Sequence, residues 1–356
     1  MANAALILAD GARFEGESFG HVGNTSGVAA FYTGVVGYQE VLTHPSYRGM
    51  LPVFTYPIIG SYGVAAEDNE SPAVQAAGLV VREASRTFSN FRAERSLGDL
   101  LGEKQVVGLR EADTRAIAVH LRDHGEMPAA IAPADADAAR LAEGLRQSGA
   151  ASSAALLADV TWAGRREPDG AACCTVAVVN LGVTGSLLTQ LHDLGCVVEV
   201  LAADASAEDV LAAGAAGVIL AGGPGDPRDL EPQIETVTGL LGQTPILGIG
   251  LGHQVLALAL GGEVEAMTSG HRGLNYPVRN EAGGRGAITV QHHRYTVSRD
   301  APGDGATVTH TNLNDATVEG LQSTAARVRG IQWHPTRDDM NRPSPTLQEF
   351  CEGLTA

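Results

Sequence analysis

The fold of the C-terminal half is decided by Pro245-Ile-Leu-Gly-Ile-Gly-Leu-Gly-His-Gln-Val-Leu-Ala-Leu-Ala-Leu-Gly-Gly262. The apolar residues 245–249 predict a buried strand, and residues 254–260 predict a helix that ends at the paired glycines. The turn Gly248-Ile-Gly-Leu-Gly252 has the glycine-x-nucleophile-x-glycine form that presents its central residue at a sheet edge. Here that residue is Gly250, which has no side chain to present.

The neighbouring segments repeat this alternation of strands and helices. Strands are expected at 174–179, 197–201 and 218–221, and helices at 186–194, 208–213 and 230–241. This spacing predicts βαβ units and a doubly wound, mostly parallel sheet, which binds ligands at the carboxyl ends of its strands. After Gly262 the helical pattern stops, and strand-like segments return at 286–290, 295–297, 307–310 and 328–333.

The N-terminal half has a different order of expected secondary-structure elements. Strand-like runs at 4–9, 28–32 and 51–56 alternate with glycine and proline turns, and one helix is expected over 114–122 with Asp113 as its N-cap. We therefore predict an α/β chain of two domains, a mixed β-rich domain over 1–150 and a doubly wound domain over 173–356. The Ala-rich and then polar stretch 151–172 is the expected linker.

Composition limits the possible partners. The 356 residues carry a net charge of −17 without a basic stripe, which argues against nucleic acid and anionic membranes. The N-terminus has no basic region before its short apolar run, and no stretch of 18 apolar residues occurs, so we expect a cytoplasmic protein. The four cysteines have no CxxC spacing, so reduced thiols and no metal site are expected.

Two further segments offer chemistry. The turn Gly222-Gly-Pro-Gly-Asp-Pro227 exposes backbone N–H groups at a strand end, and the N–H groups of Gly223 and Leu251 together would suit a carbonyl oxygen. The alternative is a tight chain reversal without function. His334 ends an apolar strand just before a proline and is a candidate general base, the alternative being a structural histidine. A dinucleotide-binding loop is disfavoured because His253 stands where its last glycine is required.

Taken together, these motifs resemble those of the class I glutamine amidotransferases, and within them the family of carbamoyl-phosphate synthetase small subunits. The matching segments run in order along nearly the whole chain. They include Thr33-Gly-Val-Val-Gly-Tyr-Gln-Glu-Val-Leu-Thr-His-Pro-Ser-Tyr47, Phe54-Thr-Tyr-Pro57, Asp113-Thr-Arg115, Gly223-Pro-Gly-Asp-Pro227, Gly252-His-Gln254, Gly270-His-Arg-Gly273 and Gln332-Trp-His-Pro335.

The resemblance implies a site and a partner. In the family, a Cys-His-Glu triad releases ammonia from glutamine, and a large, ATP-using subunit converts this ammonia to carbamoyl phosphate for arginine or pyrimidine synthesis. The small subunit itself then needs no cofactor and no metal. The glutamine-binding positions of the family fall on Ser46, Gly223, Gly225, Leu251, Gln254 and Tyr295.

Four residues depart from the family pattern. Gly250 replaces the nucleophilic cysteine, Thr336 replaces the glutamate of the triad, and His292 and Arg294 replace an asparagine and a glycine of the pocket wall. Of the triad only His334 remains. A thioester cannot form without sulfur, and a threonine cannot stabilise an imidazolium as a carboxylate does.

Three hypotheses follow from these departures. The first is a pseudoenzyme, a small subunit without glutaminase activity that supports an ammonia-dependent large subunit or a related synthetase. The second is a redirected protein in which the altered pocket binds another ligand through His253, His292, His293, His334 and Arg294. The third is a working glutaminase with a substitute nucleophile, for which the candidates are Thr184, Ser186 and Thr336.

Overall fold

The computed structural model describes residues 3–158, 162–338 and 340–355. It divides into two compact units, which are Met1–Ala151 with Thr268–Arg272 (unit 1) and Ser152–Met267 with Gly273–Ala356 (unit 2). The stretch 151–172, predicted as a linker, contains helix α5 (Ser153–Ala158) and strand β10 (Gly164–Arg166), while its residues 159–161 lie outside the described part. No helix of the described residues is long and apolar enough to cross a membrane.

Unit 1 is built on a closed barrel of seven strands. Their order is β1 (Ala4–Leu8), β2 (Arg13–Gly20), β8 (Val107–Arg110), β6 (Gly78–Val80), β4 (Met50–Phe54), β3 (Thr25–Tyr32) and β9 (Met127–Pro133). Aliphatic side chains such as Leu6, Leu51, Val53, Leu109 and Ile131 fill its interior. Closure of the barrel leaves no free strand edge.

Short elements surround the barrel of unit 1. They are α1 (Tyr38–Thr43), η1 (Pro45–Tyr47), β5 (Ile58–Ile59), η2 (Ala66–Asp68), β7 (Glu83–Ala84), α2 (Leu97–Glu103), α3 (Thr114–His124) and α4 (Ala138–Ser148). The predicted start of α3 is confirmed, because the Asp113 side chain accepts a hydrogen bond from the Ala116 N–H. Ile117 and Leu121 are both fully buried, as a single apolar helix face requires.

Unit 2 contains one ten-stranded sheet. Its order is β10, β12 (Cys196–Leu201), β11 (Cys174–Val179), β13 (Gly217–Leu220), β14 (Ile246–Ile249), β19 (Val328–Ile331), β18 (Val318–Ser323), β16 (Gly286–Val297), β15 (Val264–Asn280) and β17 (Thr307–Asn312). The strands from β12 to β19 pair in parallel, and β18 pairs antiparallel with β19. The predicted doubly wound, mostly parallel core is therefore confirmed.

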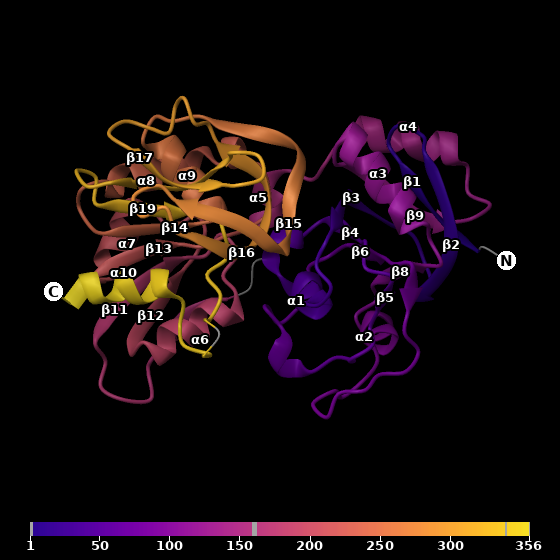
Figure 1. Ribbon diagram of the computed structural model, residues 1–356, viewed down its shortest axis with the longest axis horizontal. Coiled ribbons are helices and arrows are strands. Elements are labelled where there is room, and N and C mark those ends of the chain that lie inside the picture. Colours follow the sequence, from indigo (N-terminus) through magenta and orange to yellow (C-terminus); the bar gives the residue numbers. More distant parts are fainter. Residues whose placement is uncertain (1–2, 159–161, 339, 356) are drawn as a thin grey trace. The chain divides into compact units, whose positions relative to one another are not determined.

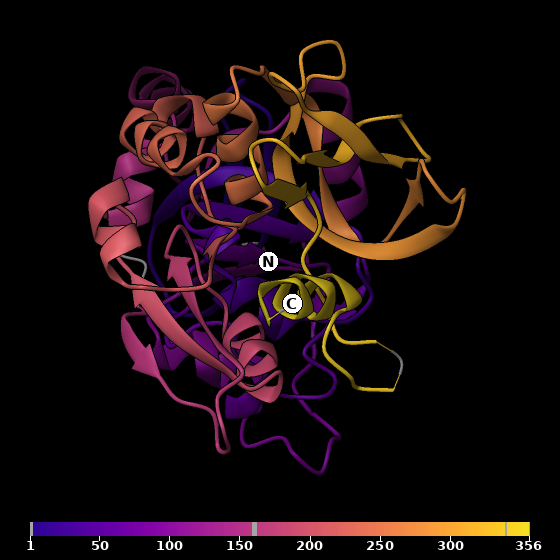
Figure 2. The same ribbon diagram turned by 90° about the vertical axis from the view of Figure 1, so that its left-hand side faces the viewer.

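Helices cover both faces of the parallel strands (Figures 1 and 2). Helices α6 (Gly185–Asp193) and α10 (Pro345–Thr355) pack on one face. Helices α7 (Ala207–Ala212), α8 (Glu231–Leu240) and α9 (Leu251–Ala259) pack on the other, and the 3-10 turn η3 (Pro227–Asp229) precedes α8. Helix α10 was not expected, because the periodicity after Gly262 indicates strands. It buries Leu347 and Cys351 against the sheet.

Candidate functional site

The predicted strand-to-helix turn is present, and Gly250 lies at its apex. The residue is the N-cap of α9 with φ 55° and ψ −111°, a backbone conformation that favours glycine. Its N–H donates to the Ile331 carbonyl at 2.8 Å, which ties the turn to the neighbouring strand β19. A Cβ atom built on Gly250 would lie 3.6 Å from Gly222 Cα and 3.8 Å from the backbone carbonyl oxygen of Gln332. The turn therefore has room for a side chain that this chain lacks.

The glycine turn 222–227 follows β13 and lies beside this apex, since Gly222 is the residue nearest to the Cβ position of Gly250. A Cβ on Gly223 would fall 2.0 Å from the Leu181 oxygen, so only glycine fits there. Gly225 has φ +99° and packs against Ser153. Leu251 begins α9, in the first turn of which N–H groups have no acceptor within the helix. The turn and the helix start thus lie side by side, and they carry the N–H groups of Gly223 and Leu251, which we predicted would bind a carbonyl oxygen.

His334 contacts a hydroxyl group from α6. Its Nε2 lies 3.1 Å from Ser186 Oγ, and Ser186 Oγ lies 3.2 Å from Thr184 Oγ1. Thr184 is the N-cap of α6 and accepts from the Leu187 N–H, so its own hydroxyl hydrogen is available for Ser186. When His334 carries its proton on Nδ1, Ser186 can donate to Nε2. This arrangement suits proton transfer between a hydroxyl and an imidazole.

A buried glutamine holds the segment that carries His334. Gln190, one turn after Ser186 on α6, donates to the Pro335 carbonyl and accepts from the Ser344 N–H, both at 2.8 Å. The His334 N–H donates to the Val290 carbonyl at 2.9 Å. Sequence reasoning missed Gln190, because nothing in its local pattern indicates which chain segment it contacts. Thr336, at the position of the triad acid, is exposed.

Gln254 and Tyr295, two of the predicted glutamine-binding residues, contact each other. The Gln254 amide donates to the Tyr295 carbonyl at 2.8 Å and to Gln332 Oε1 at 3.0 Å. Both amide hydrogens of Gln254 are thereby used within the protein, and only its oxygen is left for a ligand. The Tyr295 ring lies 5.5 Å from the Arg228 guanidinium, and burial together with Asp226 raises the pKa of its hydroxyl.

The altered pocket wall lies on β16. The His292 ring centroid is 6.4 Å from that of His334, while Arg294 is half-buried on the same strand. His293, between them, contacts the Tyr295 carbonyl through Nδ1 at 2.9 Å and Gln291 Oε1 through Nε2 at 3.0 Å. These contacts make His293 part of the scaffold rather than a free ligand group. His292 is the histidine of this strand that the structure brings near His334.

His253 is fully buried in α9, directly after the turn. Neither of its ring nitrogens has a hydrogen-bond partner among the described residues. Burial lowers the pKa of His253 to about 3, so the ring is neutral at physiological pH. Gly330 permits this packing, because a Cβ there would lie 2.4 Å from His253 Nδ1. A neutral, enclosed imidazole supports the turn from within and does not take part in acid–base chemistry.

Ser46 belongs to unit 1, whereas the other predicted glutamine-binding residues belong to unit 2. It is half-buried in η1, where its N–H donates to His44 Nδ1 at 3.1 Å. The η1 turn follows α1 within the segment 33–47. The structure of unit 1 therefore fixes the backbone of Ser46 locally.

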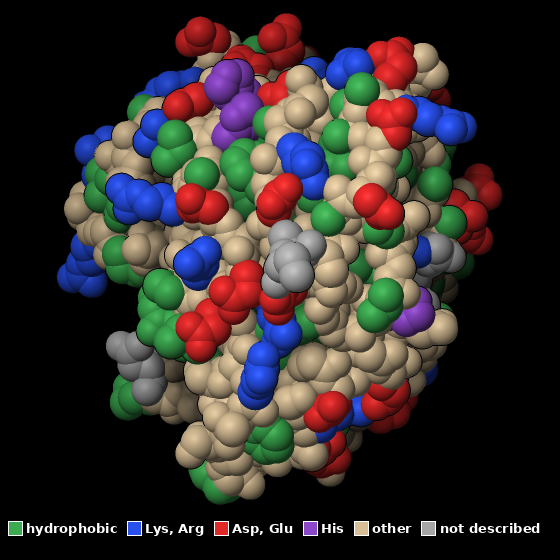
Figure 3. Space-filling view, turned by 90° about the vertical axis from the view of Figure 1, so that its right-hand side faces the viewer, with side chains coloured by type: hydrophobic (Ala, Val, Ile, Leu, Met, Phe, Trp, Pro, Cys, Tyr) green, Lys and Arg blue, Asp and Glu red, His purple; other side chains and the backbone are tan. Residues whose placement is uncertain are grey.

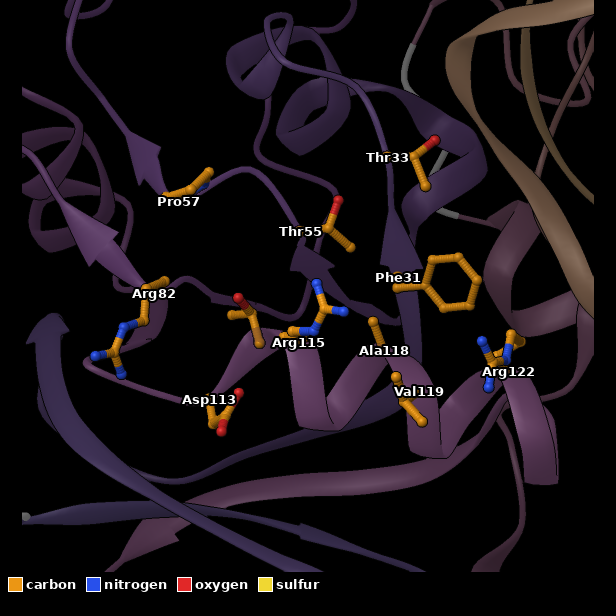
Figure 4. Close-up of a pocket in the computed structure, with 11 residues that line it drawn as sticks. Phe31, Thr33, Thr55, Pro57, Arg82, Asp113, Arg115, Ala118, Val119 and Arg122 are labelled. Atoms are coloured by element: carbon orange, nitrogen blue, oxygen red, sulfur yellow. The ribbon is translucent and has the colours of Figure 1, made fainter.

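Unit 1 has a cavity of its own, of about 650 Å³ (Figure 4). Arg115, Ala118, Val119 and Arg122 reach it from α3, and Arg82 borders it beside β7. The remaining lining residues are Phe31, Thr33, Thr55, Pro57, Asp113 and Thr114. The volume is within the range of ligand sites, about 300–1,000 Å³. The mixture of arginines and apolar groups suits an acidic or amphipathic partner.

Comparison with known proteins matches both halves of the chain. Residues 6–131 match the model "Carbamoyl-phosphate synthase small chain, CPSase domain", and residues 177–346 match "Glutamine amidotransferase class-I". The carbamoyl phosphate synthase small chain of Syntrophotalea carbinolica is 39% identical over 346 residues, covering 93% of this chain and 92% of the relative. That of Bacillus caldolyticus is 39% identical over 354 residues, with 97% and 94% covered. A pyrimidine-specific small chain from Halalkalibacterium halodurans is 39% identical, with 93% and 91% covered.

Proposed function

Because the chain belongs to the family of carbamoyl-phosphate synthase small chains, we propose that it is a small chain without glutaminase activity that supports an ammonia-using large synthetase subunit. One observation carries this proposal, namely Gly250 at the apex of the strand-to-helix turn. The backbone geometry of the turn is kept, but no atom there can attack the carboxamide of glutamine. Loss of a nucleophile costs about 10⁶ in kcat in a serine protease, too much for a metabolic flux.

Features of the unit 1 surface support the proposal that a large subunit binds to this chain. Large apolar side chains are exposed on the segments that border its cavity, namely Val35, Val36, Tyr56, Ile58 and Val119. Exposed apolar groups beside arginines are typical of protein interfaces. On the face drawn in Figure 3, Lys and Arg side chains of the described residues are interspersed with Asp and Glu, a pattern that suits a protein surface better than nucleic acid.

The test is to purify the chain together with a carbamoyl-phosphate synthase large subunit and to compare nitrogen donors. We expect carbamoyl phosphate from ammonium and bicarbonate, a background rate with glutamine, and a lower ammonium-dependent rate or stability for the large subunit alone. Binding of the two chains is measured separately by sedimentation, so loss of the partner is distinguished from loss of chemistry. Synthesis with glutamine at a rate close to that with ammonium would contradict the proposal.

A second candidate function is favoured by the contact between Ser186 and His334. With Ser186 Oγ 3.1 Å from the imidazole, Ser186 is placed as a substitute nucleophile at the start of α6. The protein would then release ammonia from glutamine through an ester in place of a thioester. Thr336 gives the resulting imidazolium no carboxylate, so the expected rate is low.

Labelled glutamine distinguishes this candidate from the first. If Ser186 is the nucleophile, glutamate release occurs in the wild-type chain and is lost in Ser186→Ala and in His334→Gln. Ser152→Ala is the matched control, because it also removes a serine hydroxyl group, but one that lies just before α5 and outside the site. If none of these chains releases glutamate, with or without the large subunit, the second candidate is eliminated.

A further inference from the structure

Three of the four cysteines come together at one edge of the unit 2 sheet. Cys173 precedes β11, Cys174 begins β11, and Cys196 begins β12. The parallel pairing of the two strands sets Cys174 opposite Cys196. The Sγ atoms are separated by 3.6 Å between Cys173 and Cys174, 3.7 Å between Cys174 and Cys196, and 3.9 Å between Cys173 and Cys196. Each thiol of this thiol triad therefore touches the other two.

The backbone holds the thiol triad in place. The Cys173 N–H donates to the Gly195 carbonyl at 2.9 Å. Gly195 itself has φ +76° and turns the chain from α6 into β12, a conformation in which glycine is favoured. Cys351, on α10, contacts Cys196 from the buried side with an Sγ separation of 3.5 Å, but it does not belong to the group of three thiols that lie within 4.8 Å of one another.

The spacing of the thiol triad suits a tetrahedral thiolate site. A Zn–S bond is about 2.3 Å, which places the sulfurs of a regular tetrahedron about 3.8 Å apart. The three observed separations, 3.6, 3.7 and 3.9 Å, lie close to that value. Sulfur ligands select soft or borderline ions such as Zn²⁺ and Cu⁺ over Mg²⁺ and Ca²⁺. Cys173 is exposed, so an ion has access from solvent and a water molecule has room as a fourth ligand.

The electrostatics of Cys174 and Cys196 argue against a reactive redox role for these two thiols. Burial, and then the neighbouring Cys196, raise the pKa of Cys174, while the contact with Cys351 and burial raise that of Cys196. Thiols with raised pKa values are weak nucleophiles in disulfide exchange. A bound divalent ion, in contrast, deprotonates the thiols that coordinate it. Each S–metal bond then forms as one thiol releases its proton to solvent.

We propose that Cys173, Cys174 and Cys196 form a binding site for a thiophilic divalent ion of the zinc class, with the fourth position open to water. The site lies at the amino ends of β11 and β12, whereas the turn at Gly250 follows the carboxyl end of β14. In a parallel sheet these are opposite edges. Such an ion would join β11 to β12 through its thiolate ligands, and the proposal does not depend on whether the chain hydrolyses glutamine.

The test is an anaerobic titration of the reduced, metal-free full chain with Co²⁺. We expect thiolate-to-cobalt charge-transfer absorption that saturates at one equivalent and is displaced by Zn²⁺. Cys173→Ser and Cys174→Ser should weaken Co²⁺ binding by about 100-fold or more, since loss of even an outer-shell partner costs 10–100-fold. Cys173 is exposed, so its replacement by serine leaves the core intact and the result can be interpreted.

Cys351→Ser is the comparison variant, because Cys351 contacts Cys196 but is not one of the three proposed ligands, and it should weaken Co²⁺ binding far less than Cys173→Ser does. Absence of the charge-transfer band in the wild-type chain would overturn the proposal, as would an equal band in a Cys173→Ser, Cys174→Ser double variant. A loss in Cys351→Ser as large as that in Cys173→Ser would overturn the assignment to three thiols. The thermal midpoint with and without Zn²⁺ gives an independent readout, because an ion that binds only the folded chain raises it.

Discussion

Gly250 and Gly223 follow neighbouring strands, and they are glycines for different physical reasons. Gly250 has a positive φ, and a Cβ there would make only ordinary van der Waals contacts, whereas Gly223 is packed against the Leu181 carbonyl. The first constraint is conformational and the second is steric. The absence of a side chain at position 250 therefore does not reflect a lack of room for a Cβ, although any residue other than glycine would be strained there.

We predict that Gly250→Ala and Gly223→Ala differ in their effect on stability. The first should cost about 2 kcal/mol, within the range for a non-glycine residue held in a sparsely populated backbone region. The second should cost about 3 kcal/mol or more, because the backbone must move to accommodate a Cβ that would lie 2.0 Å from an oxygen. Denaturant midpoints measure the difference. Equal costs for the two variants would mean that Gly223 does not pack tightly against the Leu181 carbonyl.

His253 makes stability depend on pH. Its pKa is about 3 in the folded chain and about 6.5 in the unfolded chain, so the unfolded chain takes up the proton first as pH falls. The stabilising effect of this neutral ring is complete above about pH 6.5 and is lost as pH falls toward 3. Relative to His253→Leu, the wild-type chain should lose about 2 kcal/mol between pH 8 and pH 5.

The measurement is urea unfolding of the wild-type chain and of His253→Leu at both pH values. Groups that titrate alike in the two chains cancel in the difference. His292→Leu serves as control, since His292 is half-buried rather than enclosed. A difference between wild type and His253→Leu that does not change with pH would mean that His253 is solvated or has a partner.

At the scale of elements, α6 joins the site to the rest of unit 2. One end of the helix supplies Ser186, and the next turn supplies Gln190, which binds the segment after β19 at two backbone positions. The apolar face of the same helix packs on the sheet through Leu187, Leu188 and Leu191. The position of His334 therefore depends on a helix whose Ser186 lies 148 residues earlier in the sequence.

We predict that Gln190→Leu destabilises unit 2 by at least about 2 kcal/mol. The substitution leaves the Pro335 carbonyl and the Ser344 N–H without their buried partner, and each such group costs about 1–3 kcal/mol. Gln147→Leu, at an exposed position on α4, should stay within about 0.5 kcal/mol of wild type. Thermal unfolding followed by circular dichroism compares the two, and a similar midpoint for both would contradict the role given to Gln190.

At the scale of the whole molecule, a short part of β15 belongs to unit 1, although it lies more than a hundred residues after the rest of that unit. Arg272 donates to Glu126 at 2.6 Å, and the Gly270 N–H donates to the same carboxylate oxygen at 3.0 Å. Both side chains of the ion pair are almost fully buried. The Thr33 N–H donates to the Arg272 carbonyl at 3.1 Å. Unit 1 is thus formed by two separate segments of the chain, 1–151 and 268–272.

We predict that Arg272→Met destabilises unit 1 by about 3–5 kcal/mol, because it removes the guanidinium that pairs with the buried Glu126 carboxylate. Arg122→Met, which removes one side of an exposed ion pair with Asp123, should leave the stability of unit 1 close to that of the wild-type chain. Hydrogen exchange, resolved by peptide, is the suitable measurement, since it reports each unit separately. Unchanged protection of β3 and β9 in Arg272→Met would contradict the prediction.

Local patterns in the sequence were sufficient for several features. The alternation of strands and helices predicts the parallel core, the glycines predict the turn at Gly250, and Asp113 predicts the start of α3. These features depend on residues only a few positions apart, where periodicity, capping and backbone conformation act. The absence of a nucleophile at the apex is likewise visible from the sequence alone.

Only the tertiary structure decided which distant groups meet. The contact of Ser186 with His334, the insertion of Thr268–Arg272 in unit 1 and the thiol triad all join segments that have no common local pattern. Such contacts follow from strand order and register, which the packing of the whole sheet determines. Spacing along the chain gave no sign of a metal site, because the parallel pairing of β11 with β12 is what brings Cys196 to Cys173 and Cys174.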